Sequence, residues 1–554
     1  MDIGERQRKL SLWAEQDKEL RFYDLYGLLY NQDWLKAAHA SVSKNAGSAT
    51  AGTDGINMYF FDNKFEENFG KLREELKAKT FEPDPVRRAY IPKSNGKWRP
   101  LGIPAIKDRI VQEALRMILE PIWEADFDNE SYGFRPGRCT MDAIIPLYHA
   151  LTGSNKTYQW VIEGDITSYF DTIPHRKLMK CVKKRMQDEN ILDLLWKFLR
   201  AGVLENGKFH NTMTGTPQGG IISPLLANIY LHELDSYMHK YTKLKDWDRR
   251  KRRAQGLANF IYVRYADDWV ILCNGTRAQA EEMKGEVRDF LKSELDLTLS
   301  LDKTKITHIT EGFKFLGYWL RMGTGRNGNP QMKLEIPDEA VKRMREKIHA
   351  TLAPNTFYDS VAAKMVALNR IIRGWCNYYR YCSSPTPVFN KLEHIIWWKM
   401  AHWTAGKYQT SIPKICQKYR KGKGFGTKRV RMVMPTDVKT VRYMRRKFSN
   451  LYTAENPRLA REEVFDLDSV WLGTERRRGK QDIREAVIER DGLTCKGCGK
   501  QMEHYFEAQV DHKNPRAATK RQTDADRLGN QQVLCTDCHR VKTKSDRQVL
   551  SRVR

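Results

Sequence analysis

The sequence lacks the two features that would place it in or across a membrane. It has no uninterrupted apolar run near the roughly 20 residues that a membrane-spanning helix needs. Its N-terminus, MDIGERQRKLSLWAEQDKEL, is charged throughout and has no apolar segment of the kind found in secretory signals. We therefore expect no membrane segment and a location in a reducing cytoplasm. The absence of a transit-like N-terminus favours a bacterial source over an organellar one.

Acidic residues are scarce relative to basic ones. The chain has 68 Asp plus Glu against 96 Lys plus Arg, which gives a formal net charge of +28. This excess predicts a polyanionic partner, of which nucleic acid is the simplest, although a merely soluble basic protein is the alternative. Internal repeats and long low-complexity tracts are also lacking. At 554 residues, 41% of them hydrophobic, the chain is expected to form roughly three or four packed domains.

Most of the ten cysteines show no metal-binding spacing. Six are scattered and are expected to be reduced core residues: Cys139, Cys181, Cys273, Cys376, Cys382 and Cys416. The other four form two Cys-x-x-Cys pairs, Cys495 with Cys498 and Cys535 with Cys538. Four thiolates at this spacing in a reducing compartment predict a structural Zn²⁺ site.

Two adjacent carboxylates, Asp267 and Asp268, lie between two runs rich in β-branched and aromatic residues, 260–265 and 269–273. Such runs predict strands, so we expect a hairpin with the acids at its tip. Asp165 ends another β-like run and can complete a site with them. Carboxylates in this arrangement can bind hard divalent cations, as in-line phosphoryl transfer requires.

Two further segments fit phosphoryl transfer. Residues 214–224 form a Pro/Gly-rich loop, TGTPQGGIISP, whose backbone can approach a ligand closely. Residues 89–103 read as a hairpin with a Ser-Asn-Gly turn that carries Lys93, Lys97 and Arg99. These cations could neutralise a triphosphate.

Nine short motifs in order make the chain resemble the reverse transcriptases encoded within group II introns, which are multifunctional maturases. They are GSATAGTDG, IPKSNGKWRPLGIP, KDRIVQEAL, YGFRPGR, GDITSYFDTI, GTPQGGIISPLLANIYL, YADD, SLDKTKI and FLGYWL. The resemblance implies a multidomain α+β architecture. Its parts would be right-hand reverse-transcriptase fingers and palm, a helical thumb (domain X), a basic DNA-binding region and a small C-terminal nuclease domain.

The resemblance also implies roles for residues around the acids. Asp165, Asp267 and Asp268 match the metal-binding palm triad, with two Mg²⁺ ions expected. Phe170 matches the aromatic residue that obstructs a ribose 2′-OH and so selects deoxynucleotides.

Nucleotide binding is assigned by the same resemblance. Lys93 and Arg99 match cations on the incoming triphosphate, and Gln218 lies in the loop beside the nucleotide. Lys303 of LDKTK is a further candidate near the palm, with a structural role as the alternative. Asp171 is placed outside the metal site.

The C-terminal cysteine pairs are accompanied by Asp511, His512, Asn530 and His539, in that order. This pattern resembles the HNH endonucleases, with their ββα-metal fold. The resemblance implies that His512 is the general base and that Asn530 orients its imidazole. Asp511 and His539 would hold one catalytic divalent cation, which could be Mg²⁺, Mn²⁺ or Zn²⁺. A zinc ribbon that only binds nucleic acid is the alternative.

The order of motifs predicts five regions along the chain. Residues 1–60 form an N-terminal extension with an RT0-like loop, and residues 61–325 form the fingers and palm. Residues 326–410 form the thumb, which binds intron RNA. Residues 411–480 are a basic DNA-binding region and linker, and residues 481–554 are the HNH endonuclease domain.

The helical and basic regions carry aromatic residues to which we assign different roles. In the helical region Trp398 and Trp403 belong to an apolar stripe and are expected to pack in the core. In the basic region four aromatic residues alternate with cations and are expected to stack on bases: Tyr419, Phe425, Tyr443 and Phe448. A solvated basic linker is the alternative there.

The function implied is that of an intron-encoded reverse transcriptase, maturase and DNA endonuclease. It would assist splicing of its intron RNA and remain with the lariat. The HNH domain would then nick the target DNA, and the nicked strand would prime cDNA synthesis from dNTPs. While it acts on DNA, the protein would be associated with the nucleoid. Two alternatives remain, an RNA-splicing cofactor with weak or lost catalytic activities and a standalone host reverse transcriptase. Oligomeric state and insertion site stay open.

Overall fold

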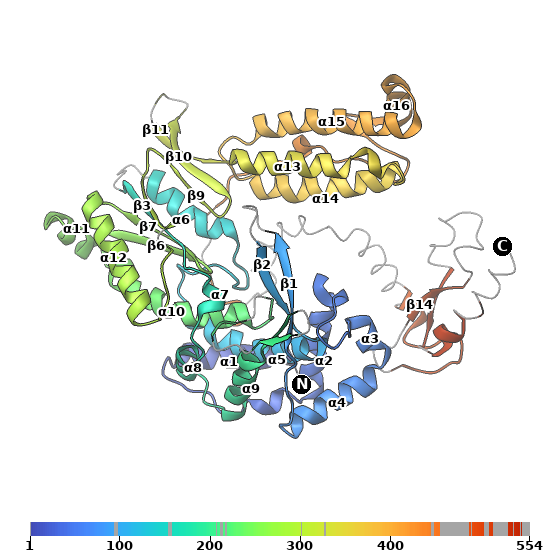
Figure 1. Cartoon of the computed structure of the whole chain (residues 1–554), viewed down its shortest axis with the longest axis horizontal. Helices are drawn as coiled ribbons and strands as arrows, with labels where there is room; N and C mark the ends of the chain where they lie inside the picture. The colour runs from blue at the N-terminus through green and yellow to red at the C-terminus, as the bar shows by residue number, and fades with distance from the viewer. Residues whose placement is uncertain are drawn as a thin grey trace. The chain divides into compact units, whose positions relative to one another are not determined.

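The chain divides into two units, Met1–Asp466 and Leu467–Arg554 (Figure 1). The computed structural model describes residues 2–92, 98–152, 158–205, 208–210, 214–216, 219–300, 302–325, 328, 330–444, 448–454, 487–488, 490–502, 509–513, 530–535, 537–542 and 545. Among these residues, no helix combines the length and the apolar character that a bilayer span needs.

An N-terminal group of helices surrounds one long, almost fully buried helix, α5 (Ile106–Glu124). The surrounding elements are α1 (Ile3–Gln16), η1 (Tyr26–Leu28), α2 (Gln32–Lys44), η2 (Ala46–Ala49), α3 (Met58–Asn63) and α4 (Phe65–Lys77). Both α1 and α2 pack on α5. The Trp34 indole N–H donates to the Ala114 carbonyl at 3.1 Å, and the Gln7 amide donates to the Met117 carbonyl at 2.9 Å.

A first four-stranded sheet has the order β2-β1-β4-β5. Its strands are β1 (Val86–Pro92), β2 (Trp98–Ile103), β4 (Val203–Glu205) and β5 (Lys208–His210). The antiparallel pair β1 and β2 is the hairpin predicted from residues 89–103, with Ile91 opposite Arg99.

A second four-stranded sheet, with the order β6-β7-β3-β8, carries the carboxylates. Its strands are β3 (Trp160–Gly164), β6 (Phe260–Tyr265), β7 (Asp268–Cys273) and β8 (Lys305–His308). Helices α6 (Thr140–Thr152) and α10 (Ser223–Thr242) contact β6, whereas α12 (Arg277–Ser293) contacts β3 and β8. The remaining helices of this part are α7 (Tyr169–Thr172), α8 (His175–Lys183), α9 (Glu189–Arg200) and α11 (Asp246–Ala254).

A three-stranded sheet and a helical module follow, and Figure 1 shows α13, α14 and α15 side by side. The sheet has the order β11-β10-β9, with β9 (Phe313–Phe315), β10 (Tyr318–Thr324) and β11 (Pro330–Glu335). The module comprises α13 (Asp338–Thr351), η3 (Pro354–Thr356), α14 (Val361–Tyr379), α15 (Thr386–Tyr408), α16 (Ile412–Tyr419), β12 (Arg420–Lys421), β13 (Gly424–Phe425) and η4 (Pro435–Asp437). One apolar core runs from Val263 in β6 through the module to Met434.

The burial of several aromatic residues differs from what the sequence predicted. Trp403 is buried as expected, whereas Trp398, on the same helix α15, is 42% exposed. Phe425 is fully buried and Tyr419 is 8% exposed, so neither ring can stack on a base. The prediction was wrong for these two residues because the segment 411–438 folds into the core of the helical module.

Residues 441–444 and 448–454, which we call the return segment, contact the helical module and the N-terminal helices. The Val441 amide donates to the Arg380 carbonyl at 3.1 Å, and the Tyr443 hydroxyl donates to Asp142 at 2.8 Å. Its far end contacts α5, where the Tyr452 hydroxyl donates to Glu120 at 2.7 Å. The return segment therefore ties elements that lie more than 300 residues apart in sequence.

The second unit contains the antiparallel strands β14 (Gln509–His512) and β15 (Gln531–Leu534), followed by helical residues 537–542. Among the described residues of this unit, a small core is formed by Val487, Ile488, Cys495, Met502, Val533, Leu534 and Cys535.

Candidate active sites

The predicted acidic hairpin is present, and its register gathers three carboxylates. Strands β6 and β7 pair with Tyr265 opposite Asp268, which leaves Ala266 and Asp267 as a two-residue turn. Ala266 has a left-handed backbone, with φ of +57°, as such tight hairpin turns require. On the other side of β7, Gly164 pairs with Trp269, so Asp165 leaves β3 beside Asp268.

The three acids influence one another electrostatically. Desolvation by the surrounding protein, together with the charges of Asp267 and Asp165, raises the pKa of Asp268 to about 6. Burial and the charge of Asp165 also raise the pKa of Asp267. The charges of Arg99 and Lys303 act in the opposite direction and lower the pKa of both acids.

Lys303 makes direct contact with the cluster. Its Nζ atom lies 2.9 Å from Oδ2 of Asp165, whose side chain is 24% exposed. The three carboxylates repel one another and offer hard oxygen atoms, the ligand type that divalent cations prefer. A cation bound there would relieve the repulsion.

A fully buried arginine that the sequence did not single out holds the acidic turn. Arg264 on β6 donates from Nη1 to the Ala266 carbonyl and to Oδ1 of Asn228, both at 2.9 Å. Its Nε donates to Oδ1 of Asp235 at 2.7 Å, and its Nη2 pairs with the other oxygen of that carboxylate. The Tyr262 hydroxyl donates to Asp235 at 2.9 Å.

A sequence signal for this network exists. Asn228 and Asp235 are seven residues apart on α10, so they share one face of the helix, and both are buried. Arg264 interrupts a strand of otherwise apolar and aromatic residues. Because a buried charge must be paired, these three polar residues were candidates for mutual contact.

The motif YGFRPGR supports the turn from a second side. The Asn228 amide donates to the Gly133 carbonyl at 2.8 Å, and the Tyr132 amide donates to the Arg264 carbonyl at 2.9 Å. A Cβ atom on Gly133 would lie 2.3 Å from the Ala266 nitrogen, so only glycine permits this approach.

The other predicted polymerase residues fall into two groups. Phe170 lies half-buried on α7, and its carbonyl accepts a hydrogen bond from the Thr216 amide at 2.7 Å. The Thr214 hydroxyl donates to the Asp171 carbonyl at 3.1 Å, so the described part of the Pro/Gly-rich loop packs on α7. Lys93 and Gln218 lie outside the described residues.

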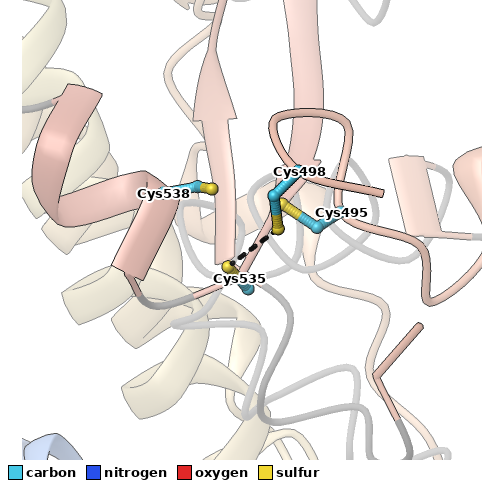
Figure 2. Close-up of side chains that lie close together, drawn as sticks. All are labelled: Cys495, Cys498, Cys535 and Cys538. Carbon is cyan, nitrogen blue, oxygen red and sulfur yellow. Dashed lines mark hydrogen bonds between the residues drawn. The ribbon is translucent and has the colours of Figure 1, made fainter. Parts of the chain in front are cut away.

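The four cysteines of the second unit come together as predicted (Figure 2). Their Sγ atoms all lie within 4.8 Å of one another, and those of Cys498 and Cys535 are 3.8 Å apart. Tetrahedral zinc with Zn–S bonds of about 2.3 Å needs sulfur pairs about 3.8 Å apart. The Gly497 amide donates to Sγ of Cys495 at 3.4 Å, as is expected for a thiolate. The cluster therefore fits Zn²⁺.

The nuclease candidates gather at one end of β14 and β15. His512 pairs with Gln531 through the backbone, and the Asn530 carbonyl accepts from the Lys513 amide at 2.6 Å. The side chain of His512 lies outside what the structure describes.

The two predicted metal ligands lie near each other. His539, in the helical residues 537–542, has Nε2 4.0 Å from Oδ2 of Asp511 on β14. Lys542, which the sequence reading missed, lies one turn further along the same helix. Its Nζ is 3.5 Å from the same Asp511 oxygen. The arrangement brings a carboxylate, an imidazole and a cation to one place.

Three family models match successive parts of the chain. They are Reverse transcriptase (RNA-dependent DNA polymerase) over residues 91–320, Group II intron, maturase-specific domain over residues 341–420, and HNH endonuclease over residues 495–545.

Curated relatives agree with these matches. The chain is 43% identical to Protein YkfC of Escherichia coli over 64% of its own length and 97% of that relative. It is 29% identical to the Group II intron-encoded protein LtrA of Lactococcus lactis subsp. cremoris over 96% of its own length and 97% of the relative. It is 28% identical to Nuclear intron maturase 2, mitochondrial, of Arabidopsis thaliana over 39% of its own length and 37% of that relative.

Replacing Arg264 with methionine tests the buried network. The change leaves the Asp235 carboxylate buried without its cation, so we expect a loss of about 3–5 kcal/mol in the free energy of unfolding of the first unit. Urea unfolding, followed by tryptophan fluorescence, measures this loss. Arg288→Met is the control, because Arg288 makes an exposed ion pair with Asp289 and should change stability little. Equal urea midpoints for the two variants would contradict the assignment.

Proposed function

The chain belongs to the family of reverse transcriptases encoded by group II introns, with a maturase domain and an HNH endonuclease domain, and we propose how its residues divide the work. The β2-β1-β4-β5 sheet acts as the fingers, the β6-β7-β3-β8 sheet as the palm, and α13, α14 and α15 as the thumb. The observation that carries the polymerase proposal is the strand register, which brings Asp165 beside Asp268 and next to the turn that bears Asp267.

At the palm, Asp165, Asp267 and Asp268 hold Mg²⁺. When bound, Mg²⁺ polarises the phosphoryl oxygens and neutralises charge that develops on them. Lys303 balances the charge of Asp165 and keeps that carboxylate at the cluster, as their ion pair supports. Arg99, whose charge acts on the same acids, binds the triphosphate of the incoming dNTP together with Lys93.

The nucleotide's sugar and base are recognised beside α7. Phe170 obstructs a ribose 2′-OH and thereby selects dNTPs. Gln218 contacts the nucleotide from the Pro/Gly-rich loop, whose described part is bonded to the backbone of Phe170 and Asp171.

Nucleic acids bind to the helical module and to the basic residues between 414 and 442. The maturase-specific match supports binding of intron RNA by residues 341–420. Ten basic residues between 414 and 442 are exposed and face phosphates of target DNA: Lys414, Lys418, Arg420, Lys421, Lys423, Lys428, Arg429, Arg431, Lys439 and Arg442.

In the second unit, Cys495, Cys498, Cys535 and Cys538 hold Zn²⁺ and keep the two knuckles together. His512 accepts a proton from the attacking water, and Asn530 orients its imidazole. Asp511 and His539 hold a divalent cation that would stabilise charge on the scissile phosphate. The nick leaves a 3′-OH, which primes cDNA synthesis at the palm.

Primer extension on an RNA template with dNTPs and Mg²⁺ tests the polymerase site. We expect Asp268→Asn to lower the rate at least about 100-fold, because one of three charges that bind the cations is lost. Asp171→Asn is the control, since it keeps the backbone carbonyl that Thr214 contacts. Undiminished extension by Asp268→Asn would overturn the site. A wild type that binds structured RNA tightly and makes no cDNA would favour a splicing cofactor.

Nicking of duplex target DNA by the ribonucleoprotein tests the second site. We expect His539→Ala to abolish nicking of the target DNA by the HNH domain. Primer extension should be unchanged, because His539 belongs to the second unit and the palm acids belong to the first. Arg288→Met, which removes one partner of an exposed ion pair away from both proposed sites and from the helical module, should nick normally. If His539→Ala nicks at the wild-type rate, the nuclease assignment is wrong.

Metal analysis of the purified chain tests the cysteine cluster. We expect about one zinc per chain, and Cys535→Ser should lose it together with folding of the second unit, because a structural zinc site contributes folding free energy directly. Cys416→Ser, outside the cluster, should retain the metal. Zinc content that is equal in both variants would contradict the site.

A further inference from the structure

Three non-glycine residues with a left-handed backbone lie in segments that meet around the polymerase site. They are Phe134, with φ of +58°, Ser168, with φ of +46°, and Ala266, with φ of +57°. Ala266 forms the acidic turn, and Ser168 precedes the helix that bears Phe170. A left-handed backbone is most unfavourable for a bulky residue. The strained conformation of Phe134 therefore needs an explanation more than those of Ser168 and Ala266 do.

The backbone on both sides of Phe134 is fixed. On one side, the Gly133 carbonyl accepts from Asn228 at 2.8 Å, and Gly133 lies against the Ala266 nitrogen. On the other side, Arg135 is buried and its Nη2 lies 2.9 Å from Oε2 of Glu124. The single residue between these two anchors therefore has little freedom to relax.

The strain is not explained by burial of the ring. Phe134 is 55% exposed, so its side chain adds little to the core. Its ring instead meets Phe170, with ring centroids 6.3 Å apart and planes at 82°, an edge-to-face contact.

A second ring also contacts Phe170. Tyr169 meets it with centroids 5.5 Å apart and planes at 65°. Tyr169 is itself fixed, because it is buried and its hydroxyl donates to the Ala227 carbonyl at 2.6 Å. Phe134 supplies the other contact, from a segment bonded to the acidic turn.

We propose that Phe134 is a specificity-determining residue, whose ring fixes the position of Phe170 and thereby sharpens the exclusion of ribonucleotides. The proposal rests on the proposed role of Phe170 in obstructing the 2′-OH. Through Gly133, the same segment contacts the turn that carries Asp267. Two neighbouring residues, Gly133 and Phe134, therefore contact the acidic turn and the ring of Phe170.

The test compares kcat/KM for a dNTP with that for the matching rNTP, using the full chain on an RNA template. Phe134→Leu should lower the preference for the dNTP by roughly 2- to 10-fold, the range expected for loss of one aromatic pair. Phe134→Tyr, which keeps the ring, should retain the wild-type preference. Phe170→Ala is the reference and should lower the preference further.

Phe134→Asn separates the proposal from a folding defect. Asparagine accepts a left-handed backbone readily, so this variant should melt no lower than wild type and still lose selectivity. Wild-type selectivity in Phe134→Leu and Phe134→Asn, while Phe170→Ala is relaxed, would overturn the inference alone. Equal losses for dNTP and rNTP would also overturn it, since they indicate contact with nucleic acid. If Phe170→Ala keeps full selectivity, the proposed role of Phe170 fails and the inference fails with it.

Discussion

The guanidinium of Arg264 has no contact with solvent, and the geometry of the polymerase site depends on how it is paired. Asp235 neutralises its charge, and the side-chain oxygen of Asn228 and the Ala266 carbonyl accept further hydrogen bonds from it. One group therefore joins helix α10, strand β6 and the acidic turn. A buried ion pair stabilises little by itself, but breaking it is costly, which makes it suited to fixing one arrangement. Gly133 packs directly against the same turn.

Much of both sites could be predicted from sequence because their signals are local. Asp267 and Asp268 lie between two runs of strand-forming residues, and a two-residue turn between such runs has few alternatives. The zinc site could be predicted for the same reason, because Cys-x-x-Cys spacing already brings two thiolates to one metal. Arg99 and Lys303 were named from motifs; Lys303 pairs with Asp165, and the charge of Arg99 lowers the pKa of Asp267 and Asp268.

What could not be predicted depends on contacts between distant segments. The density of lysine and arginine around Phe425 suggested an exposed surface, yet its ring is buried and packs against Trp397 on α15. The return segment is likewise invisible in sequence, because the partner of Tyr443 is Asp142, about 300 residues earlier. The left-handed backbone of Phe134 follows only from the anchors on its two sides. The contact of Lys542 with Asp511 could not be predicted either, because it depends on how the helix 537–542 packs beside β14.

The central claim is that the acidic turn is held in place before substrate binds, with Asp165, Asp267 and Asp268 already brought together by the strand register. A crystal structure of the chain with an RNA template, a DNA primer, a dNTP and Ca²⁺ in place of Mg²⁺ tests it most directly. We expect two cations bound by Asp165, Asp267 and Asp268, the deoxyribose against Phe170, and the Arg264 hydrogen bonds unchanged. Cations bound elsewhere, or a turn that has to rearrange and release Arg264 before the acids meet, would contradict the account.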